Sequence, residues 1–442
     1  MFYIYNLDIG NMQRKQLVII GGGFGGLNLA KHVSEKEWDV IIVDKHNYHS
    51  FPPLFYQVAS SGLEPASISF PFRRELHNRK YRNATFHMGT VKEVDALAHE
   101  VYTEFETIHY DALVIAAGTT NNFFGIPDLE KHVFTIKSTP EAIRTRNEVL
   151  DRLEQASLCK DEALRRRLLT FVVVGGGPAG VEIAGALGEM KRYIVPREYR
   201  SIDPSEVKVI IVEGTDALLR AMSVKSQNDA RKGLEQLMVE VQLNKTMKKY
   251  EDGTVYFADG STIETETLIW TAGVTGVPFE IKGANVTLER GARLPVDQFN
   301  HVVGVPDIYA IGDIAMMETE KYPHGHPQVA QVALQMGKNL ARNLSRENPR
   351  PFTYRDKGSM ATIGRNRAVV DIGKFHLSGY IAWLAWIVVH LISLLGMRNR
   401  AVVLINWTWS YFTFATGLRL LMRPDRYPLR SYWNEKPRPS SR

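Results

Sequence analysis

Two glycine patterns in this chain of 442 residues have the spacing of turns that bind a pyrophosphate. They are Gly21-x-Gly23-x-x-Gly26 and Gly175-x-Gly177-x-x-Gly180. Each follows a run of β-branched residues and leads into an alanine-rich stretch that is expected to be helical. In that setting, backbone N–H groups and a helix N-terminus can hold a pyrophosphate. One such pattern is weak evidence, but two in the right setting predict two bound dinucleotides, with electrons passing between them.

Two acidic residues stand where each dinucleotide would place a ribose. Asp44 ends an expected strand at 40–43, and Glu213 ends another at 207–212. A carboxylate at this position accepts hydrogen bonds from ribose hydroxyls; the alternative for Asp44 is an exposed acid at a strand end. Glu213 would also repel the 2′-phosphate of NADPH, and no Lys or Arg occupies the next three positions. We therefore expect a preference for NADH.

The elements that position these motifs predict an α/β fold with two Rossmann-like dinucleotide-binding domains. Further buried strands are expected at 16–20, 110–116, 168–174, 263–270 and 307–311. The second nucleotide unit lies between two parts of the first, so we predict a split domain at 12–125 and 290–350 with a nested domain at 126–289. A polar insertion at 191–205 lengthens the nested unit. Residues 351–442 are expected to form a strand pair followed by amphipathic helices.

The overall composition is that of an ordinary globular protein, with 44% hydrophobic and 23% charged residues. The single cysteine, Cys159, is expected in a helix and excludes both a disulfide framework and a redox dithiol. His324 and His326 have no cysteine or spaced carboxylate set nearby, so we expect a loop rather than a metal site. The N-terminus has no features of a signal or transit peptide, and we expect translation to start at Met12.

The C-terminal segment is basic and rich in tryptophan. Residues 351–442 contain fourteen Lys and Arg against four Asp and Glu, a net charge of +10 in a chain of +6, so the remainder carries −4. Five of the seven tryptophans are also here. Basic residues with interfacial aromatics suggest an anionic membrane surface. Apolar runs argue against the competing possibility, a nucleic acid.

Two apolar stretches, at 377–395 and 401–422, are candidates for the membrane contact. A helical wheel of the first separates two groups of residues. On one side are Leu377, Ile381, Leu384, Val388, Leu391 and Leu395, and on the other are Ser378, Trp386, His390 and Ser393. This asymmetry and the flanking Arg398, Arg400, Arg419 and Arg423 favour helices lying in the membrane interface over helices spanning the bilayer. A dimerisation or core-packing hairpin is the alternative.

Several stretches of the chain resemble the type II NADH dehydrogenases, the single-subunit NADH:quinone oxidoreductases. The matching stretches are residues 47–59, 110–118, 124–127, 175–187, 330–335 and 352–364. The most specific is 330–335, Ala-Gln-Val-Ala-Leu-Gln, which matches the quinone-site pattern Ala-Gln-x-Ala-x-Gln of the family. The resemblance covers nearly the whole chain. It implies non-covalent FAD at the first glycine pattern and NADH, as substrate, at the nested one.

The resemblance also implies further cofactor contacts. These are Gln57, Ala117, Gly118, Gly312 and Asp313 for FAD, with Gly273 on the NADH side. A helix is expected to begin at Ile314, and its N-terminus with the Asp313 carboxylate would suit the pyrophosphate and the ribityl hydroxyls. Helix N-capping is the simpler role for Asp313 and is compatible with cofactor binding.

Three residues are candidates for quinone chemistry. The resemblance places Glu182 near the nicotinamide and the flavin, and quinone reduction consumes two protons; alternatively, Glu182 only stabilises a helix N-terminus. A helix is expected near Pro327, where Gln331 and Gln335 would share one face. Gln331 could donate to a quinone carbonyl or could simply pack on the flavin domain. Lys357 could supply positive charge or could pair with Asp356.

We thus expect a non-proton-pumping NADH:quinone oxidoreductase that uses menaquinone or ubiquinone. It would be attached peripherally to the cytoplasmic face of a bacterial membrane, with homodimerisation left open. The single cysteine excludes disulfide reductases and sulfide:quinone oxidoreductases, and a soluble ferredoxin reductase would not need the basic aromatic tail. A nucleotide-sensing flavoprotein, or an NADH reductase with a non-quinone acceptor, is the alternative.

Overall fold

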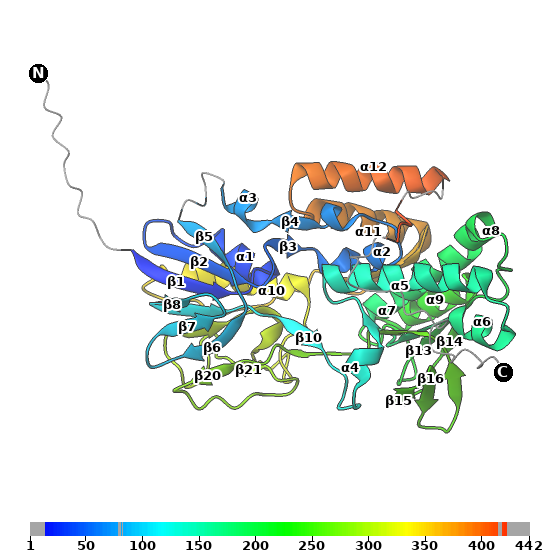
Figure 1. Ribbon diagram of the computed structural model, residues 1–442. Coiled ribbons are helices and arrows are strands. Elements are labelled where there is room, and N and C mark those ends of the chain that lie inside the picture. The colour runs from blue at the N-terminus through cyan, green and yellow to red at the C-terminus, as the bar shows by residue number, and fades with distance from the viewer. Residues whose placement is uncertain (1–13, 78–80, 82, 414–417, 422–442) are drawn as a thin grey trace, which may run out of the picture.

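The computed structural model describes residues 14–77, 81, 83–413 and 418–421, so Met1, Met12 and Arg423 lie outside the described part. A five-stranded parallel sheet forms the first nucleotide unit (Figure 1). In spatial order its strands are β22 (Ile308–Ala310), β9 (Ala112–Ile115), β1 (Lys15–Ile20), β2 (Trp38–Asp44) and β5 (Ala84–Met88). The strand at Ile308–Ala310 thus belongs to the same sheet as the first strand of the chain, Lys15–Ile20.

The nested unit repeats the same arrangement. Its parallel strands are, in spatial order, β11 (Phe134–Thr135), β18 (Thr267–Trp270), β12 (Thr170–Val174), β13 (Lys208–Val212) and β14 (Val239–Gln242). Continuous β-branched runs form these strands because both faces of a parallel sheet are covered. In each sheet the strand order reverses beside the strand that leads into the glycine turn, β1 in the first unit and β12 in the nested one. Such a reversal opens a crevice where ligands bind in doubly wound folds.

Helices cover both sheets. They are α1 (Phe24–Ala30), α5 (Thr139–Leu158), α6 (Glu162–Leu168), α7 (Pro178–Glu189), α9 (Val224–Gln236) and α10 (Ala330–Asn343). The polar insertion at 191–205 is partly helical, because α7 continues through a π-helical turn at Met190–Ile194 into α8 (Val195–Glu198).

Smaller elements complete the two units. Two are short helices, α2 (Phe55–Ala59) and α3 (Phe72–Leu76). Two are pairs of strands, β3 (Tyr48–Ser50) with β4 (Ser69–Pro71) and β10 (Thr119–Asn121) with β19 (Val274–Gly276). Two are larger sheets, one of β6 (Val91–Asp95), β7 (Glu100–Thr103), β8 (Thr107–His109) and β20 (Glu280–Lys282), the other of β15 (Met247–Glu251), β16 (Thr254–Phe257) and β17 (Thr262–Glu264). The single strand predicted at 263–270 was wrong. Two strands, β17 and β18, divide this segment and belong to different sheets.

Two helix starts also differ from the prediction. No α-helix begins at Ile314: residues Gly312–Ile314 form one 3₁₀ turn, and strand β23 (Ala315–Met316) follows directly. Helix α10 starts at Ala330 with Val329 as its N-cap, so Pro327 lies outside it. The N-terminal dipole expected at Asp313 is therefore absent.

A three-stranded antiparallel sheet follows α10, one strand more than predicted. It consists of β24 (Ser359–Gly364), β25 (Arg367–Ile372) and β26 (Phe375–Ser378). This sheet packs tightly on α7, because a Cβ added to Gly185 would lie 1.9 Å from the carbonyl oxygen of Ile363. The glycine allows the C-terminal sheet to contact the nucleotide helix directly.

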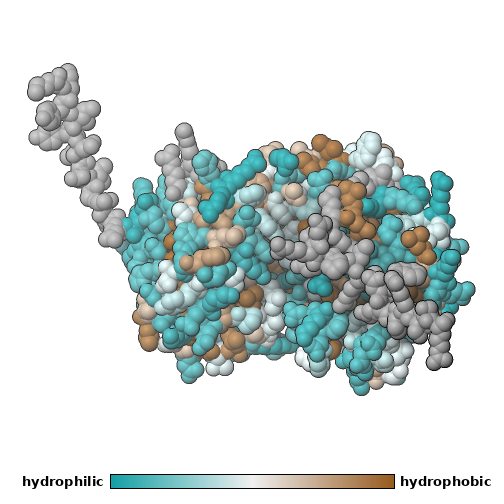
Figure 2. All heavy atoms as spheres, in the orientation of Figure 1, coloured by the Kyte–Doolittle hydropathy of each residue, from teal (hydrophilic) through white to brown (hydrophobic). Residues whose placement is uncertain are grey.

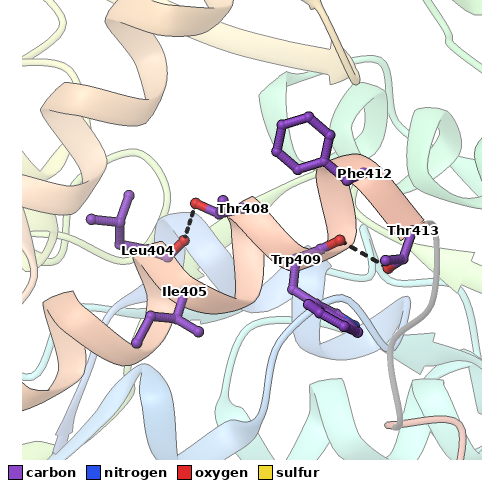
Figure 3. Close-up of a pocket in the computed structure, with 6 residues that line it drawn as sticks. All are labelled: Leu404, Ile405, Thr408, Trp409, Phe412 and Thr413. Carbon is purple, nitrogen blue, oxygen red and sulfur yellow. Dashed lines mark hydrogen bonds between the residues drawn. The ribbon is translucent and has the colours of Figure 1, made fainter.

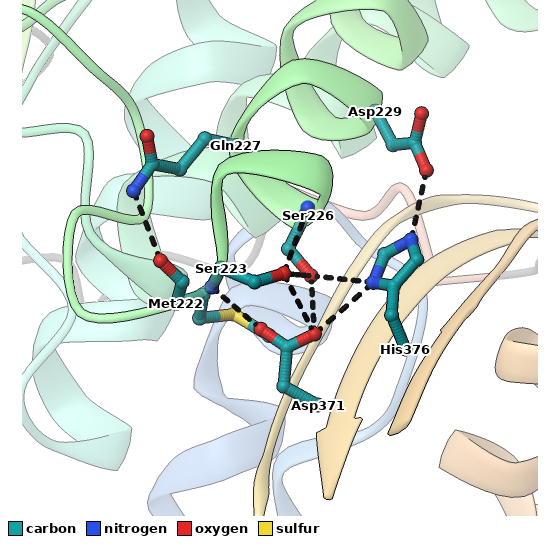
Figure 4. A network of polar contacts seen from close by, with 7 residues as sticks. All are labelled: Met222, Ser223, Ser226, Gln227, Asp229, Asp371 and His376. Carbon is teal, nitrogen blue, oxygen red and sulfur yellow. Dashed lines mark hydrogen bonds and ion pairs between the residues drawn. The ribbon is translucent and has the colours of Figure 1, made fainter. Parts of the chain in front are cut away.

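A partly buried polar cluster fastens this sheet to α9 (Figure 4). The Asp371 carboxylate accepts hydrogen bonds from the backbone N–H of Ser223 at 2.7 Å and from the Ser226 hydroxyl at 2.9 Å. The His376 ring lies between Asp371, at 3.0 Å, and Asp229, at 3.1 Å. Burial acts to raise the pKa of Asp371, but these hydrogen bonds outweigh it and hold the pKa below its usual value.

The chain then forms two helices, α11 (Gly379–Ser393) and α12 (Met397–Thr413), which lie together at the top of Figure 1, above α2. Leu377 belongs to β26 and not to the first helix. On the other side of the predicted wheel, Trp386 and His390 are buried against the protein, whereas Ser378 and Ser393 are exposed. Among the described residues, no helix has the length and apolarity needed to cross a bilayer.

Candidate functional site

Each glycine in the two fingerprints has a separate geometric role. Gly21 and Gly175 adopt φ values of 98° and 112°, which only glycine tolerates easily. A Cβ added to Gly26 would lie 2.0 Å from the carbonyl oxygen of Gly21, and one at Gly180 would lie 1.8 Å from that of Gly175. These third glycines let the helix pack on the strand.

The second glycines, Gly23 and Gly177, are different. A Cβ at either position would have no heavy atom within 4 Å. Packing therefore does not require glycine there, whereas the approach of a pyrophosphate to the backbone does. The residues present fit two dinucleotides, one at each turn.

The two ribose acids are anchored in the same way. Asp44 accepts the backbone N–H of Gly22 at 2.8 Å, and Glu213 accepts that of Gly176 at 2.6 Å. Thr215 donates its backbone N–H to the other Glu213 oxygen at 2.8 Å. Burial raises the pKa of Asp44, although these backbone hydrogen bonds oppose the shift. Each carboxylate is held at the edge of its glycine turn, as ribose binding requires.

Four of the five further residues that the resemblance assigns to FAD lie at the carboxyl ends of β9 and β22, namely Ala117, Gly118, Gly312 and Asp313; the fifth, Gln57, lies on α2. Ala117 and Gly118 follow β9, and Gly118 has open space where a Cβ would stand. Asp313 is half-buried, and burial raises its pKa against the charges of Lys137 and Arg293. Its carboxylate also accepts the Thr119 hydroxyl at 3.4 Å, so the segments after β9 and β22 meet there.

Lys137 is a residue that sequence reasoning missed. Burial lowers the pKa of its ammonium group, while the nearby Asp313 and Glu141 oppose that shift. It lies in the loop before α5, and it belongs to no motif in the sequence that would have indicated a site residue. The small residues after β22 also pack more closely than expected, since an added Cβ at Gly312 would lie 3.2 Å from that of Ala333 on α10.

The two glutamines of the Ala-Gln-x-Ala-x-Gln segment share one face of α10. They bind the irregular segment 351–358 that precedes β24, hereafter the strap. Gln331 accepts the backbone N–H of Lys357 and donates to the carbonyl of Gly358, both at 3.0 Å. Gln335 makes the same pair of bonds with the backbone of Arg355, at 2.9 and 3.0 Å. The structure thus brings Gln331 and Lys357 together through the backbone.

Lys357 is exposed and makes no ion pair with Asp356 within the part of the chain that the structure describes. The Asp356 carboxylate instead accepts the backbone N–H of Gly358 at 2.9 Å. The ammonium group of Lys357 is therefore available as a positive charge beside Gln331.

Glu182 is a buried carboxyl group on α7. Burial raises its pKa to about 8, and the backbone N–H of Thr362 and the indole N–H of Trp386 oppose this shift without cancelling it. The Thr362 contact is long, at 3.5 Å, and the Trp386 Nε1 has no acceptor at hydrogen-bonding geometry among the described residues. Glu182 therefore retains a proton at neutral pH.

Gln57 lies on α2, which packs against α7. Its side chain donates to the hydroxyl of Tyr56 and accepts from the indole of Trp407 on α12, both at 2.7 Å. Trp386 of α11 packs edge-on against the buried Tyr56 ring, with centroids 6.4 Å apart. Tyr56, Trp386 and Trp407 were not predicted as site residues, because Tyr56 is 122 residues from the start of α7 and the two tryptophans lie within apolar runs.

Gly273 lies after β18, beneath the ring of Phe124. An added Cβ would meet that ring at 2.6 Å, while the Phe124 side chain is 62% exposed and has a φ of 51°. Phe124 therefore covers the position predicted for a nucleotide contact. Its ring must shift for anything larger than glycine to occupy this site.

Cys159 and His326 lie outside the predicted cofactor sites. Cys159 is buried just after α5, rather than within a helix as predicted, and is a free thiol. His326 lies in a loop among aromatic rings, with both ring nitrogens buried and without partners in the described chain. The described residues contain no group of three potential metal ligands.

Comparisons with known proteins agree with this geometry. Residues 15–337 match the pyridine nucleotide-disulphide oxidoreductase family, and residues 357–413 match the NDH2 C-terminal domain. The type II NADH:quinone oxidoreductase Ndh of Mycobacterium tuberculosis is 35% identical over 92% of this chain and 90% of its own length. The chain belongs to the type II NADH:quinone oxidoreductases.

Other type II relatives extend the match. NdhA of M. tuberculosis is 36% identical over 91% of this chain and 88% of its own length. The structure of NDH2 from Plasmodium falciparum in complex with NADH superposes with a TM-score of 0.86, covering 93% of this chain and all of that one at 21% identity. A sulfide:quinone oxidoreductase from Aquifex aeolicus shares the fold at a TM-score of 0.70 and 19% identity. The predicted family and fold class are confirmed.

Proposed function

We propose a route for electrons and protons through this chain, which by family is an FAD-dependent NADH:quinone oxidoreductase. The turn at Gly21–Gly26 would hold FAD, and the turn at Gly175–Gly180 would hold NADH. Bound FAD accepts a hydride from NADH and passes two electrons to a quinone. The division into a split domain, 12–125 with 290–350, and a nested domain, 126–289, places these turns in separate units.

The observation that carries the proton part of the proposal is the buried carboxyl of Glu182. It lies on the helix of the NADH turn and faces the C-terminal sheet and α2. With a pKa of about 8, the group holds a proton at neutral pH and can release it to a reduced quinone. Glu182 would then be one of the two proton sources that quinone reduction needs.

On the quinone side, Gln331 and Lys357 would act as a pair. Gln331 fixes the backbone of the strap at Lys357 and Gly358 and retains a second amide hydrogen for a quinone carbonyl. The free ammonium group of Lys357 would stabilise negative charge that develops on the quinone oxygen.

We further propose that α11 and α12 attach the enzyme to the cytoplasmic face of a bacterial membrane. Their exposed residues are almost all apolar: Ile381, Leu384, Val388, Val389, Ile392, Met397, Leu404, Ile405, Trp409 and Phe412, hereafter the apolar face. In Figure 2 hydrophobic residues appear along the upper edge, where α12 lies. Figure 3 shows α12 side chains of this face projecting from the helix and lining an open groove.

The basic residues beside the apolar face differ in their partners. Arg398 is exposed, and Arg400 donates to the carbonyl of Leu394 at 2.8 Å, a neutral acceptor that leaves its positive charge in place. Arg419 pairs with Glu198, with one contact at 2.6 Å, and that pair is neutral. Attachment would therefore combine apolar burial with attraction of Arg398 and Arg400 to anionic lipids.

Vesicle flotation tests this attachment against dimerisation, the competing use of the apolar face. The double variant Ile381→Glu with Ile405→Glu should no longer bind and float with vesicles of neutral lipids, and it should remain active with a water-soluble quinone. If the variant still floats, the membrane assignment is wrong. If instead it converts a dimer into a monomer that still binds vesicles, the apolar face is a subunit interface.

The quinone assignment is tested by Gln331→Leu. Loss of both backbone hydrogen bonds and of the free amide hydrogen should raise the quinone KM about tenfold, the effect of one or two hydrogen bonds. Reduction of the flavin by NADH, followed anaerobically by absorbance, should not change. Slower flavin reduction would place Gln331 on the NADH side and contradict the proposal.

A further inference from the structure

The indole of Trp407 connects the outer helix α12 to the interior of the protein. Its Nε1 donates to Oε1 of Gln57 at 2.7 Å, across 350 residues of sequence. Ile405 and Trp409, two residues before and after it, are exposed on the apolar face, whereas Trp407 is partly buried and packs against the core. Trp407 also packs against Trp386, with ring centroids 5.6 Å apart.

The chemistry of the indole decides the orientation of the Gln57 amide. An indole nitrogen is a donor only, so the amide oxygen must face Trp407. The amide nitrogen then faces the Tyr56 hydroxyl, to which it donates at 2.7 Å. Without Trp407, the amide could rotate by half a turn and offer its oxygen to Tyr56 instead.

The orientation of Gln57 in turn sets the proton of Tyr56. Because the hydroxyl oxygen accepts from Gln57, its own hydrogen points away from Gln57 and is free to donate. The Tyr56 ring is buried, with 7% of the residue exposed. Burial and the nearby Glu182 both raise the pKa of Tyr56, so the hydroxyl keeps its proton.

We propose that Trp407 is a positioning residue for quinone reduction: its indole N–H orients the Gln57 amide, which turns the Tyr56 hydroxyl into a hydrogen-bond donor beside Glu182. This inference rests on the proposed function, because it concerns the buried donors on the side of Glu182. In the opposite amide orientation, the Tyr56 hydrogen would be bound to Gln57 and unavailable to a quinone oxygen. Helix α12, which carries part of the apolar face, thus also determines whether the Tyr56 hydroxyl can donate a hydrogen bond to the quinone.

The test removes the indole N–H and retains the indole shape. Trp407 is replaced by β-(3-benzothienyl)alanine, an isostere without the N–H, and by phenylalanine in a second variant. Both should lower kcat/KM for quinone about five- to tenfold, the effect of one hydrogen bond. The rate of flavin reduction by NADH should stay unchanged. Trp383→Phe is the matched control, because the Trp383 ring packs on Tyr411 of the same helix pair and, among the described residues, no hydrogen bond or ring contact joins it to Gln57.

A second readout is independent of turnover. In protein labelled with ¹⁵N at the indoles, the Trp407 signal should be protected from exchange and should shift when Gln57→Leu removes its acceptor. The kinetic effects of the Trp407 isostere and of Gln57→Leu should also be non-additive, since both break the same chain of contacts.

Three outcomes would overturn the inference. The isostere could retain full quinone activity while only Trp407→Phe loses it, which would show a packing role. The indole signal could be unaffected by Gln57→Leu. The two kinetic effects could add independently. If instead the unmodified protein reduces no quinone while the indole signal behaves as expected, the proposed function fails and the hydrogen-bond relay remains.

Discussion

Replacing Glu182 by glutamine should change the pH dependence of stability in a direction fixed by its burial. Burial raises the carboxyl pKa from 4.5 to about 8, so the folded protein keeps a proton that the unfolded chain loses. The free energy of unfolding must then fall as the pH rises through this window. A pKa difference of this size corresponds to ~5 kcal/mol at ~1.4 kcal/mol per unit. Below pH 4.5, the pKa of Glu182 in the unfolded chain, this contribution of the protonated carboxyl to the free energy of unfolding is fully present. It is lost as the pH rises to about 8, the pKa in the folded protein.

The assay compares the free energies of unfolding of the wild type and Glu182→Gln in denaturant at pH 5 and at pH 9. The amide has the shape of the protonated acid and cannot ionise, so the two proteins should be similar at pH 5. At pH 9 the variant should be more stable by several kcal/mol, at most ~5. Infrared spectra provide a direct check, because the C=O stretch of a protonated carboxyl should persist at pH 7 and be missing in the variant. Parallel stability curves for the two proteins would refute the reasoning.

Three further predictions concern the glycine turns, the ribose acid and the C-terminal sheet. Gly180→Ala should prevent folding of the nested unit because its Cβ would meet the Gly175 oxygen, whereas Gly177→Ala should fold but raise the NADH KM; solubility and kinetics separate them. Glu213→Gln should narrow the ratio of kcat/KM for NADH over NADPH by about tenfold, since charge repulsion is lost. Asp371→Asn should lower the free energy of unfolding by about 1–3 kcal/mol, measured in denaturant, because an NH2 group would replace one of the two oxygens that accept from Ser223 and from the buried Ser226.

The sequence was sufficient where local chemistry decides the structure. Runs of β-branched residues predicted the central strands of both sheets within one or two residues for β1, β2 and β13. The glycine spacings predicted the turns, because positive φ, open backbone and close helix packing are all local requirements. The acids at the ends of β2 and β13 followed from the same pattern.

The rest depended on contacts between distant segments. Nothing in the sequence near Trp407 indicates that its indole reaches Gln57. Asp313 is a good N-cap, which favours a helix at Ile314, but residues 315–316 pair with residues 294–295 as strands and end the helical turn after three residues. The flanking arginines could not be assigned either, since the acceptors of Arg400 and Arg419 lie elsewhere in the fold.

The most direct test of the central claim is a single anaerobic cycle with the purified protein. Addition of one equivalent of NADH should bleach the flavin absorbance, and addition of a menaquinone or ubiquinone analogue should restore it with formation of one quinol per NADH. Glu182→Gln should bleach at the normal rate and recover slowly, because only the second half of the cycle consumes protons. A protein that carries no flavin, or a bleached flavin that no quinone reoxidises, would contradict the account.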